Sequence, residues 1–144
     1  MNIVYPALIS YDREQENYRV EFPDLFEAIS QGKNMEEALN NATQVLTLTL
    51  EIRLDEGIEI SLPSKIKNAF MIAPSARVQA ALLIRQAKGS YTTSDIARAL
   101  KTSWPAGARL ENPHHWPTLR QLEKAAEALG HRLVLSLERT HCQG

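Results

Sequence analysis

Apolar and polar residues alternate along the first part of the chain, as they do in half-buried β-strands. Residues 2–11 (NIVYPALISY) and 18–22 (YRVEF) are rich in β-branched and aromatic side chains, which favour strands. The polar run at 12–17 is typical of a turn, so the two segments predict a β-hairpin. Pro6 has no backbone N–H to donate, so we expect an edge or a bulge at that point of the first strand. Residues 27–32 (EAISQG) predict a third, shorter strand.

The hydrophobic period then changes from two residues to that of a helix. Asn34 is a suitable N-cap, and Glu37 stands three residues later, as in a capping box. One apolar stripe follows at helical spacing, formed by Leu39, Ala42, Leu46, Leu50 and Leu54. Gly57 is the expected end of this helix. Residues 58–64 (IEISLPS) alternate again and predict a fourth strand, which gives a β-β-β-α-β unit with one helix packed on a small sheet.

A polar stretch that begins with a proline, residues 63–69, separates this unit from the rest of the chain. Residues 70–74 (FMIAP) fit either a short strand or part of the linker. We therefore expect a first domain over residues 1–65, a linker over 66–75 and a second domain over 76–144. The whole pattern predicts an α+β protein made of two small domains.

Short helices dominate the second domain. The pattern predicts helices over residues 76–88, 92–100, 101–112 and 118–129. The expected caps are Ser75, Thr92, Ser103 and Thr118 at the starts, with Gln121 completing a capping box, and Gly89 and Gly130 at the ends. Residues 131–138 (HRLVLSLE) alternate and predict a C-terminal strand.

The charged residues are divided unequally between the two halves. Residues 1–75 carry six Lys/Arg and twelve Asp/Glu, a net charge of −6. Residues 76–144 carry ten Lys/Arg and five Asp/Glu, a net charge of +5. Such an asymmetry is typical of two modules with different partners, and the basic half suits a polyanion. The alternative is ordinary variation between solvated surfaces.

Composition places the chain among globular proteins, with 44% hydrophobic and 23% charged residues in 144. Its single cysteine, Cys142, cannot form an internal disulfide, which indicates a reducing compartment. Residues 1–10 lack the basic run and apolar core of a signal peptide, and no stretch reaches the roughly 18 apolar residues of a membrane helix. We therefore expect a cytoplasmic protein without a membrane partner.

The two short helices that follow a longer one predict a helix-turn-helix. In that motif the first short helix braces the second, which lies in the major groove and reads base edges. The apolar residues that would lock the two helices together are Ile96, Ala97, Leu100 and Leu110. The small side chain of Ala97 permits a close approach.

The predicted DNA contacts come from three parts of this motif. They are Thr92, Thr93 and Ser94 for a phosphate, Lys101 and Thr102 in the turn, and Ser103, Trp104, Ala106 and Arg109 on the reading helix. Trp116, beyond that helix, is expected in the core or in an interface. The alternative is a helical dimerisation domain without a role in DNA binding.

Residues 76–130 resemble the Cro-type (XRE) helix-turn-helix family. The stretch TTSDIARALKTSWPAGARLEN matches the family pattern Q-x-x-L-A-x-x-x-G-[VI]-S-x-x-x-[IV]-S-x-x-E, with two departures. Lys101 replaces the turn glycine and would have to adopt a left-handed conformation or a different turn. Gly107 replaces a β-branched core residue, at a cost of about 1 kcal/mol in helix propensity, and is expected to leave packing space.

Residues 3–64 resemble the HicB antitoxin family. The motifs YPALIS, YRVEFPDLFEAISQG, NMEEALNNA and GIEISLPS occur in the family's order, although Phe26-Glu27 replaces the usual Pro-Gly pair. The resemblance implies a first domain with a partial ribonuclease-H-like fold. It also implies an antitoxin that binds and silences a small mRNA-cleaving HicA-type toxin and represses its own operon through a DNA-binding domain.

The loop after the second predicted strand is the expected toxin-binding surface. Leu25 and Phe26 are expected to be exposed and to supply apolar contact, while the acids Asp24 and Glu27 suit a basic RNA-binding toxin. The full predicted set is Tyr5, Phe22, Asp24, Leu25, Phe26 and Glu27. For operator binding we expect a homodimer or higher oligomer on a palindrome, in which residues 133–137 pair with their symmetry mates.

An enzymatic role for the first domain is not expected. A ribonuclease-H-type centre needs several carboxylates around two metal ions about 4 Å apart, but the first predicted strand contains no acid, and Glu21 with Asp24 does not suffice. The other acids are expected at helix ends and facing solvent: Glu36, Glu37, Glu51, Asp55 and Glu56. His114 and His115 are adjacent and need not converge on zinc.

We therefore expect no catalytic residue, no metal and no cofactor. Two other functions stay open on the sequence alone. One is a stand-alone transcriptional regulator whose first domain senses a small ligand, and the other is a residual ribonuclease-H-like nuclease.

Overall fold

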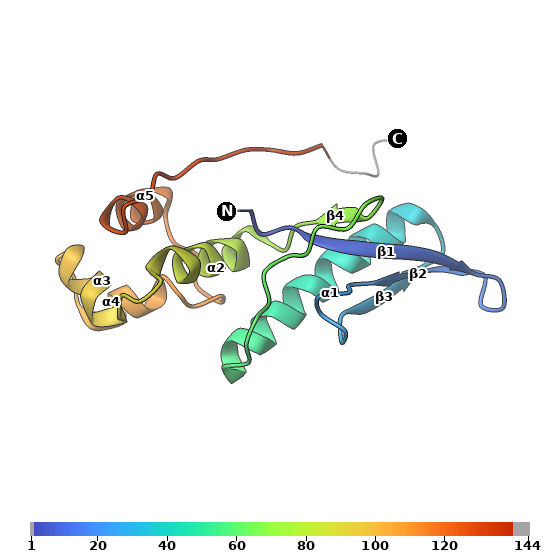
Figure 1. The fold of residues 1–144 in the computed structure, drawn as a ribbon, viewed down its shortest axis with the longest axis horizontal. Helices are drawn as coiled ribbons and strands as arrows, with labels where there is room; N and C mark the ends of the chain where they lie inside the picture. Colours follow the sequence, from blue (N-terminus) through green and yellow to red (C-terminus); the bar gives the residue numbers. More distant parts are fainter. Residues whose placement is uncertain (1, 140–144) are drawn as a thin grey trace. The chain divides into compact units, whose positions relative to one another are not determined.

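The computed structural model describes residues 2–139 and divides the chain into two compact units, Ile3–Ser75 and Ala76–Leu137 (Figure 1). The described residues form a mixed α+β structure with one four-stranded antiparallel sheet and five helices. The boundary between the units falls at the start of the first helix of the second unit.

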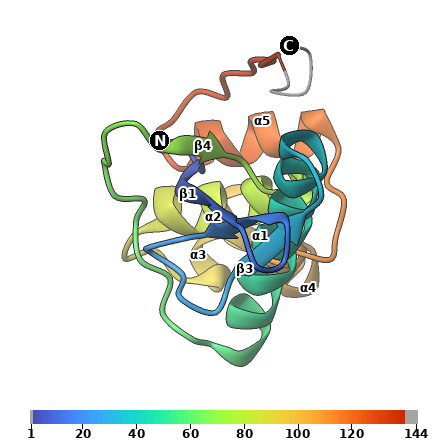
Figure 2. The ribbon, with the colours of Figure 1, turned by 90° about the vertical axis from the view of Figure 1, so that its right-hand side faces the viewer.

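The first unit contains the whole sheet and one long helix. Its elements are β1 (Tyr5–Asp12), β2 (Asn17–Glu21), β3 (Ile29–Gly32), α1 (Met35–Glu56) and β4 (Phe70–Ile72). The strands lie in the order β3-β2-β1-β4, and each neighbouring pair is antiparallel. Figures 1 and 2 show α1 lying along one face of this sheet. The predicted hairpin, third strand and helix are confirmed.

Pro6 lies where β1 has a neighbour on one side alone. Residues 8–12 of β1 pair with β2, whereas residues 5–7 pair with β4, and Pro6 stands opposite Met71. The β2 side of Pro6 is therefore a local edge, where a missing N–H breaks no ladder bond. The predicted edge position is confirmed.

The start of α1 is held by side-chain caps and by a close approach to β3. The Asn34 side chain accepts a hydrogen bond from the Glu37 N–H at 2.8 Å, as predicted. The Glu37 carboxylate accepts from the Lys33 N–H at 2.8 Å, one residue before the position that a capping box uses. A Cβ at Gly32 would lie 2.3 Å from the Ala38 nitrogen, so the end of β3 requires a glycine. Gly57 closes the helix in a left-handed conformation, with φ +68°.

The predicted fourth strand at residues 58–64 is wrong. These residues form no strand, and β4 is built instead by Phe70–Ile72, within the expected linker 66–75. Side chains of the first unit hold the 58–64 segment in place of a ladder: the Tyr5 hydroxyl donates to the Ser61 carbonyl and Arg53 donates to the Glu59 carbonyl, both at 3.0 Å. Alternation alone therefore did not identify the strand partner of β1.

The second unit contains four helices. They are α2 (Ala76–Lys88), α3 (Thr93–Ala99), α4 (Trp104–Arg109) and α5 (Leu119–Ala128). Thr92, Ser103 and Thr118 cap the last three as predicted, and Thr118 with Gln121 forms the expected capping box. The predicted cap at Ser75 is wrong, because its buried hydroxyl makes no hydrogen bond to the start of α2. The helices enclose one apolar cluster of Ile84, Ile96, Leu110, Ala125 and Leu129, against which Leu100 packs.

The predicted C-terminal strand at residues 131–138 is also not observed. In the part of the chain that the structure describes, these residues follow α5 without pairing to another strand. Their alternating pattern is that of a half-buried strand, but a strand needs a neighbour, and the described chain supplies none here.

Candidate functional sites

The loop over residues 23–28 turns one apolar side chain inward and the next outward. The Leu25 N–H donates to the Phe22 carbonyl at 3.0 Å, and the Ala28 N–H donates to the Leu25 carbonyl at 2.9 Å. These two turns direct Leu25 into the core, where its side chain is fully buried, and leave Phe26 82% exposed. The predicted exposure of Phe26 is confirmed, and that of Leu25 is wrong.

Two other residues predicted to contact a toxin are core residues. Tyr5 and Phe22 are each 1% exposed, so neither offers surface to a partner in this conformation. The Tyr5 hydroxyl donates to the Ser61 carbonyl, and burial, with the nearby Asp24 carboxylate, raises the pKa of Tyr5 to about 12. Their place on the inward side of the strands, which the alternating pattern already indicated, explains why the assignment fails.

The two acids of this loop are bound to the unit itself. The Arg53 guanidinium donates to both carboxylate oxygens of Glu27, at 2.7 and 2.8 Å, and these bonds hold the pKa of Glu27 below its ordinary range. The Asp24 carboxylate accepts from the backbone N–H of Ser64, at 2.9 Å, and from the Ser64 hydroxyl. Both carboxylates are therefore engaged within the first unit, where they hold the loop in its conformation.

These bonds join residues 23–28 to residues 58–64, and we call the two segments the paired loops. Each carries one strongly exposed apolar side chain, Phe26 at 82% and Leu62 at 70%. Leu62 stands between Ser61, held by Tyr5, and Ser64, held by Asp24. Leu62 is not among the predicted contact residues, because the alternating pattern of residues 58–64 places it in a strand. The available signal for an exposed Leu62 is the proline that follows it, because Pro63 lacks the backbone N–H that a paired strand would use.

In the second unit, α3 and α4 are joined by a tight turn with a lysine in the left-handed position. Lys101 has φ +53°, as expected for a residue in place of the turn glycine. The Thr102 N–H donates to the Ala97 carbonyl at 2.9 Å, and the Lys101 N–H donates to the Arg98 carbonyl at 3.1 Å. This pair of bonds is a Schellman motif, which usually has glycine where Lys101 stands.

The two helices of this motif approach each other closely at Gly107. A Cβ added to Gly107 would lie 3.2 Å from the Ala97 Cβ. The packing space expected beside Gly107 is therefore absent, because α4 has moved in against α3. The prediction that Ala97 permits a close approach is confirmed.

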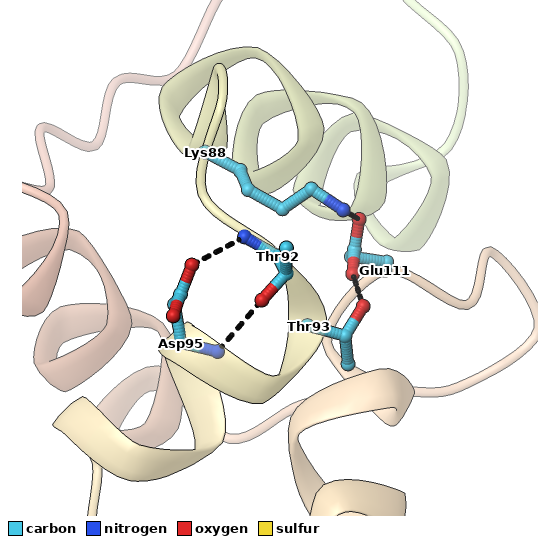
Figure 3. Close-up of polar contacts among 5 residues, drawn as sticks. All are labelled: Lys88, Thr92, Thr93, Asp95 and Glu111. Atoms are coloured by element: carbon cyan, nitrogen blue, oxygen red, sulfur yellow. Dashed lines mark hydrogen bonds and ion pairs between the residues drawn. The ribbon is translucent and has the colours of Figure 1, made fainter.

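A buried carboxylate ties three parts of the unit together, as Figure 3 shows. Glu111 is 9% exposed, accepts the Thr93 hydroxyl at 3.0 Å and pairs with the Lys88 ammonium at 2.7 Å. Lys88 ends α2, Thr93 begins α3 and Glu111 follows α4. The cluster therefore fixes the C-terminal end of α4 relative to α2 and α3.

The start of α3 is occupied by its own capping bonds. The Thr92 hydroxyl accepts from the Asp95 N–H at 3.1 Å, and the Asp95 carboxylate accepts from the Thr92 N–H at 2.9 Å (Figure 3). These bonds hold the pKa of Asp95 low, which keeps a negative charge there. Of the three residues predicted to hold a phosphate, Thr92 and Ser94 are exposed. The Thr92 hydroxyl is engaged in the cap and the Thr93 hydroxyl donates to Glu111, which leaves Ser94 as the better candidate.

The predicted reading surface is mostly exposed. Lys101, Thr102, Ser103, Trp104 and Arg109 are exposed and Ala106 is half-buried, with Trp104 at 57%. The Ser103 hydroxyl caps α4 by accepting from the Ala106 N–H at 3.3 Å. Trp116 is 66% exposed, which excludes the core as its place, and its expected place in an interface stays a prediction.

The carboxylates of the described chain do not gather into one site. Within residues 2–139, no group of three His, Cys, Asp or Glu side chains is placed to hold a metal ion. Glu21 pairs with Arg19 at 2.9 Å, and Glu51, expected to face solvent, is 8% exposed. The same residues contain no helix that is long and apolar enough to span a membrane.

Known proteins similar to this chain are antitoxins. A family model described as the HicB-like antitoxin of bacterial toxin-antitoxin systems matches residues 4–76. Antitoxin HicB 1 of Photorhabdus laumondii subsp. laumondii is 28% identical over 138 residues, covering 95% of this chain and 88% of that protein. Antitoxin HicB of Escherichia coli is 28% identical over 134 residues, covering 91% and 96%. The family model covers the first unit, whereas the similarity to the two relatives extends over both units.

Proposed function

Because the chain belongs to the HicB-like antitoxin family, we propose that its first unit binds and inhibits a HicA-type toxin and that its second unit binds operator DNA. The observation that carries the proposal is the agreement between the matched residues 4–76 and the unit Ile3–Ser75. The antitoxin relatives support a regulatory role without catalysis. A cytoplasmic location is part of the proposal.

Three features of the first unit support toxin binding. Residues 1–75 have a net charge of −6, which attracts a basic RNA-binding protein. The paired loops present Phe26 and Leu62, and large apolar side chains of this kind often carry most of the energy of an interface. The Arg53–Glu27 pair and the Asp24–Ser64 bonds hold the loops before binding, which lowers the entropy lost on association.

The second unit supports DNA binding through its α3–α4 arrangement and its exposed cation. Arg109 is exposed on α4, and Lys101 is exposed in the turn before it. A homodimer is part of the proposal, because one such motif is small, and two-fold symmetry would match a palindrome with half-sites about one helical turn or a multiple apart. The proposed contact set is Ser94, Lys101, Thr102, Ser103, Trp104, Ala106 and Arg109.

A second candidate for this unit is dimerisation without DNA. The observation that favours it is the carboxylate of Asp95 at the start of α3, where a phosphate would otherwise approach. Capture of labelled operator DNA by the purified chain decides between the two candidates.

Co-expression tests the division of labour between the units. The chain, residues 1–75 and residues 76–144 are each expressed with a HicA-type toxin, and growth and co-purification are scored. We expect the chain and residues 1–75 to restore growth, and residues 76–144 to fail. If residues 1–75 neither restore growth nor co-purify at any expression level, the assignment is wrong. Varying the level allows for avidity that a dimer adds.

A further inference from the structure

The segment after α5 exposes a row of apolar side chains. Its departure point is fixed, because Gly130 has φ +76° and the His131 N–H donates to the Ala126 carbonyl at 2.7 Å. Beyond it, Val134 is 80% exposed, Leu135 65% and Leu137 fully exposed. Large apolar groups in such a run are usually covered by a partner.

The segment is patterned as a strand with one apolar face. In an extended chain, alternate side chains share a face, so Leu133, Leu135 and Leu137 lie together. The opposite face carries Arg132, Val134, Ser136 and Glu138. One face of the segment therefore carries three leucines, and the other face carries a positive charge at one end and a negative charge at the other. This pattern fits a β-strand whose partner strand is absent.

We propose that this neighbour is the same segment of a second copy, paired antiparallel and centred on Leu135. The inference rests on the proposed homodimer and specifies its contact. A two-fold axis that passes through a strand relates two antiparallel strands, and an interface of this kind uses the same patch on both subunits. Leu135 of each copy then lies opposite Leu135 of the other, and Leu133 lies opposite Leu137.

Charge selects this register from the others. Centring on Leu135 places Arg132 of each copy opposite Glu138 of the other, which gives two ion pairs across the ribbon. Centring on Val134 or on Ser136 breaks both ion pairs and leaves two of the three cross-strand leucine pairs. A centre between two residues leaves no leucine opposite another leucine, because all three leucines stand at odd-numbered positions.

The ribbon also has apolar surface available to cover its leucines. A groove of about 360 Å³ lies between α3 and α5, and its lining combines the apolar side chains of Tyr91, Ile96, Ala99, Ala128 and Leu129 with the charged side chains of Asp95 and Arg98. A two-stranded ribbon is marginal alone and gains stability by packing on helices. The segment begins at the end of α5, next to this groove, so the second unit itself can cover the leucines of the ribbon.

Cross-linking tests the register. In a Cys142→Ser background, which removes the natural thiol, Leu135→Cys should give a disulfide-linked dimer on mild oxidation, because opposed Cα atoms lie about 4.5–5.5 Å apart, within disulfide reach. Leu133→Cys and Leu137→Cys should each cross-link poorly alone and well when combined in one chain. A Leu135→Cys chain that stays monomeric, or Val134→Cys that links better, overturns the proposal.

Charge reversal gives a second, reversible test. Arg132→Glu or Glu138→Arg should each raise the dimer dissociation constant about tenfold, because each places like charges opposite each other twice. The double exchange should restore it to within about threefold. Failure of the double exchange to restore dimerisation overturns the proposal.

Neither measurement involves DNA or toxin, so the register of the ribbon is tested separately from the proposed function. A chain that fails to cross-link at residue 135 but represses its operator overturns this register and leaves the proposed function standing. A chain that cross-links there but binds no operator supports the register and contradicts the DNA-binding part of the proposed function.

Discussion

Gly107 of α4 lies so close to Ala97 of α3 that a Cβ on residue 107 would stand 3.2 Å from the Ala97 Cβ. The two short helices α3 and α4 thus pack through a contact between two small residues. The family pattern instead has a β-branched side chain at the position of Gly107. The same added Cβ would lie 3.4 Å from the Ala97 Cα, so the backbone of α3 as well as the Ala97 side chain limits the size of residue 107. Packing here compensates for the low helix propensity of glycine.

Enlarging Gly107 should destabilise the unit in proportion to size. Gly107→Val is expected to lower the free energy of unfolding by about 1–3 kcal/mol through overpacking. Gly107→Ala should be nearly neutral, because about 1 kcal/mol of helix propensity offsets the crowding. Denaturant unfolding followed by tryptophan fluorescence measures this, since Trp104 and Trp116 both lie in the second unit. Ala99→Val, at an exposed position of α3, is the control, and an equal loss there would contradict the packing argument.

The left-handed Lys101 predicts a stabilising substitution. A non-glycine residue at φ +53° carries a conformational cost of about 1 kcal/mol that glycine avoids. Lys101→Gly should therefore raise the unfolding free energy by about 0.5–1 kcal/mol, whereas Lys101→Ala removes the same charge and keeps the strain. The same fluorescence measurement compares the two variants. Equal stability of the glycine and alanine variants would show that the turn is unstrained.

The Glu27–Arg53 pair predicts a pH-dependent contribution to the first unit. Arg53 holds the pKa of Glu27 below its unfolded value, so the stabilisation is present above that value and is lost as pH falls through the folded pKa. Glu27→Gln should lower the unfolding free energy at pH 7 by about 0.5–1.5 kcal/mol, because Arg53 loses its anionic partner, while solvent at Glu27, which is 39% exposed, screens the pair. The difference from the natural chain should shrink on acidification, measured by circular dichroism. A difference that stays constant from neutral to acid pH contradicts this account.

Features decided by neighbouring residues could be predicted from the sequence. The caps at Asn34, Thr92, Ser103 and Thr118 were found from residue type and spacing, and with them the starts of four helices. Comparison of this turn with its family pattern predicts either a left-handed Lys101 or a different turn, and the structure has the first. Each of these signals acts within a few residues of chain, so no tertiary information was needed.

Features decided by distant partners could not be predicted in this way. Residues 58–64 and 131–138 alternate as strands do, but neither has a partner in the described chain, whereas Phe70–Ile72 is short and pairs with β1. Leu25 and Phe26 are adjacent and similar in hydrophobicity, and two backbone hydrogen bonds decide which one is buried. The exposed position of Leu62 depends on the hydrogen bond from the Ser64 N–H to Asp24, which is distant in sequence.

Phe26 and Leu62 are predicted to be the apolar anchors of toxin binding. Phe26→Glu should weaken binding by about 1–4 kcal/mol, the range of an interface hot spot, and Leu62→Glu should have an effect in the same range. Both side chains are exposed, so folding should be unchanged. Leu48→Glu, which replaces a 54% exposed leucine on α1, is the matched control and should leave affinity unaltered. Titration calorimetry with purified toxin measures all three, and unchanged affinity for both loop variants would exclude the paired loops from the interface.

Arg109 and Lys101 should contribute differently to DNA binding. Arg109 is the exposed cation of α4, and its guanidinium can bind a guanine edge or a phosphate through two hydrogen bonds. Lys101 precedes α4 in the turn, where it can reach the DNA backbone. Arg109→Ala should therefore lower operator affinity by about 1–3 kcal/mol and relax preference at one base position. Lys101→Ala should weaken binding to all sequences alike and reduce the salt dependence by about one unit of slope.

Affinities for operator and scrambled DNA at several salt concentrations decide between these roles. Equal losses on both DNAs for Arg109→Ala would identify a phosphate contact in place of base reading. Neither substitution should change toxin neutralisation, because both residues lie in the second unit. Arg85→Ala removes a cation from α2, outside the proposed reading surface, and should leave operator affinity within about 0.5 kcal/mol of the natural value. If neither Arg109→Ala nor Lys101→Ala lowers affinity for either DNA, the proposed reading surface is wrong, and a second unit that acts by dimerisation without DNA is favoured.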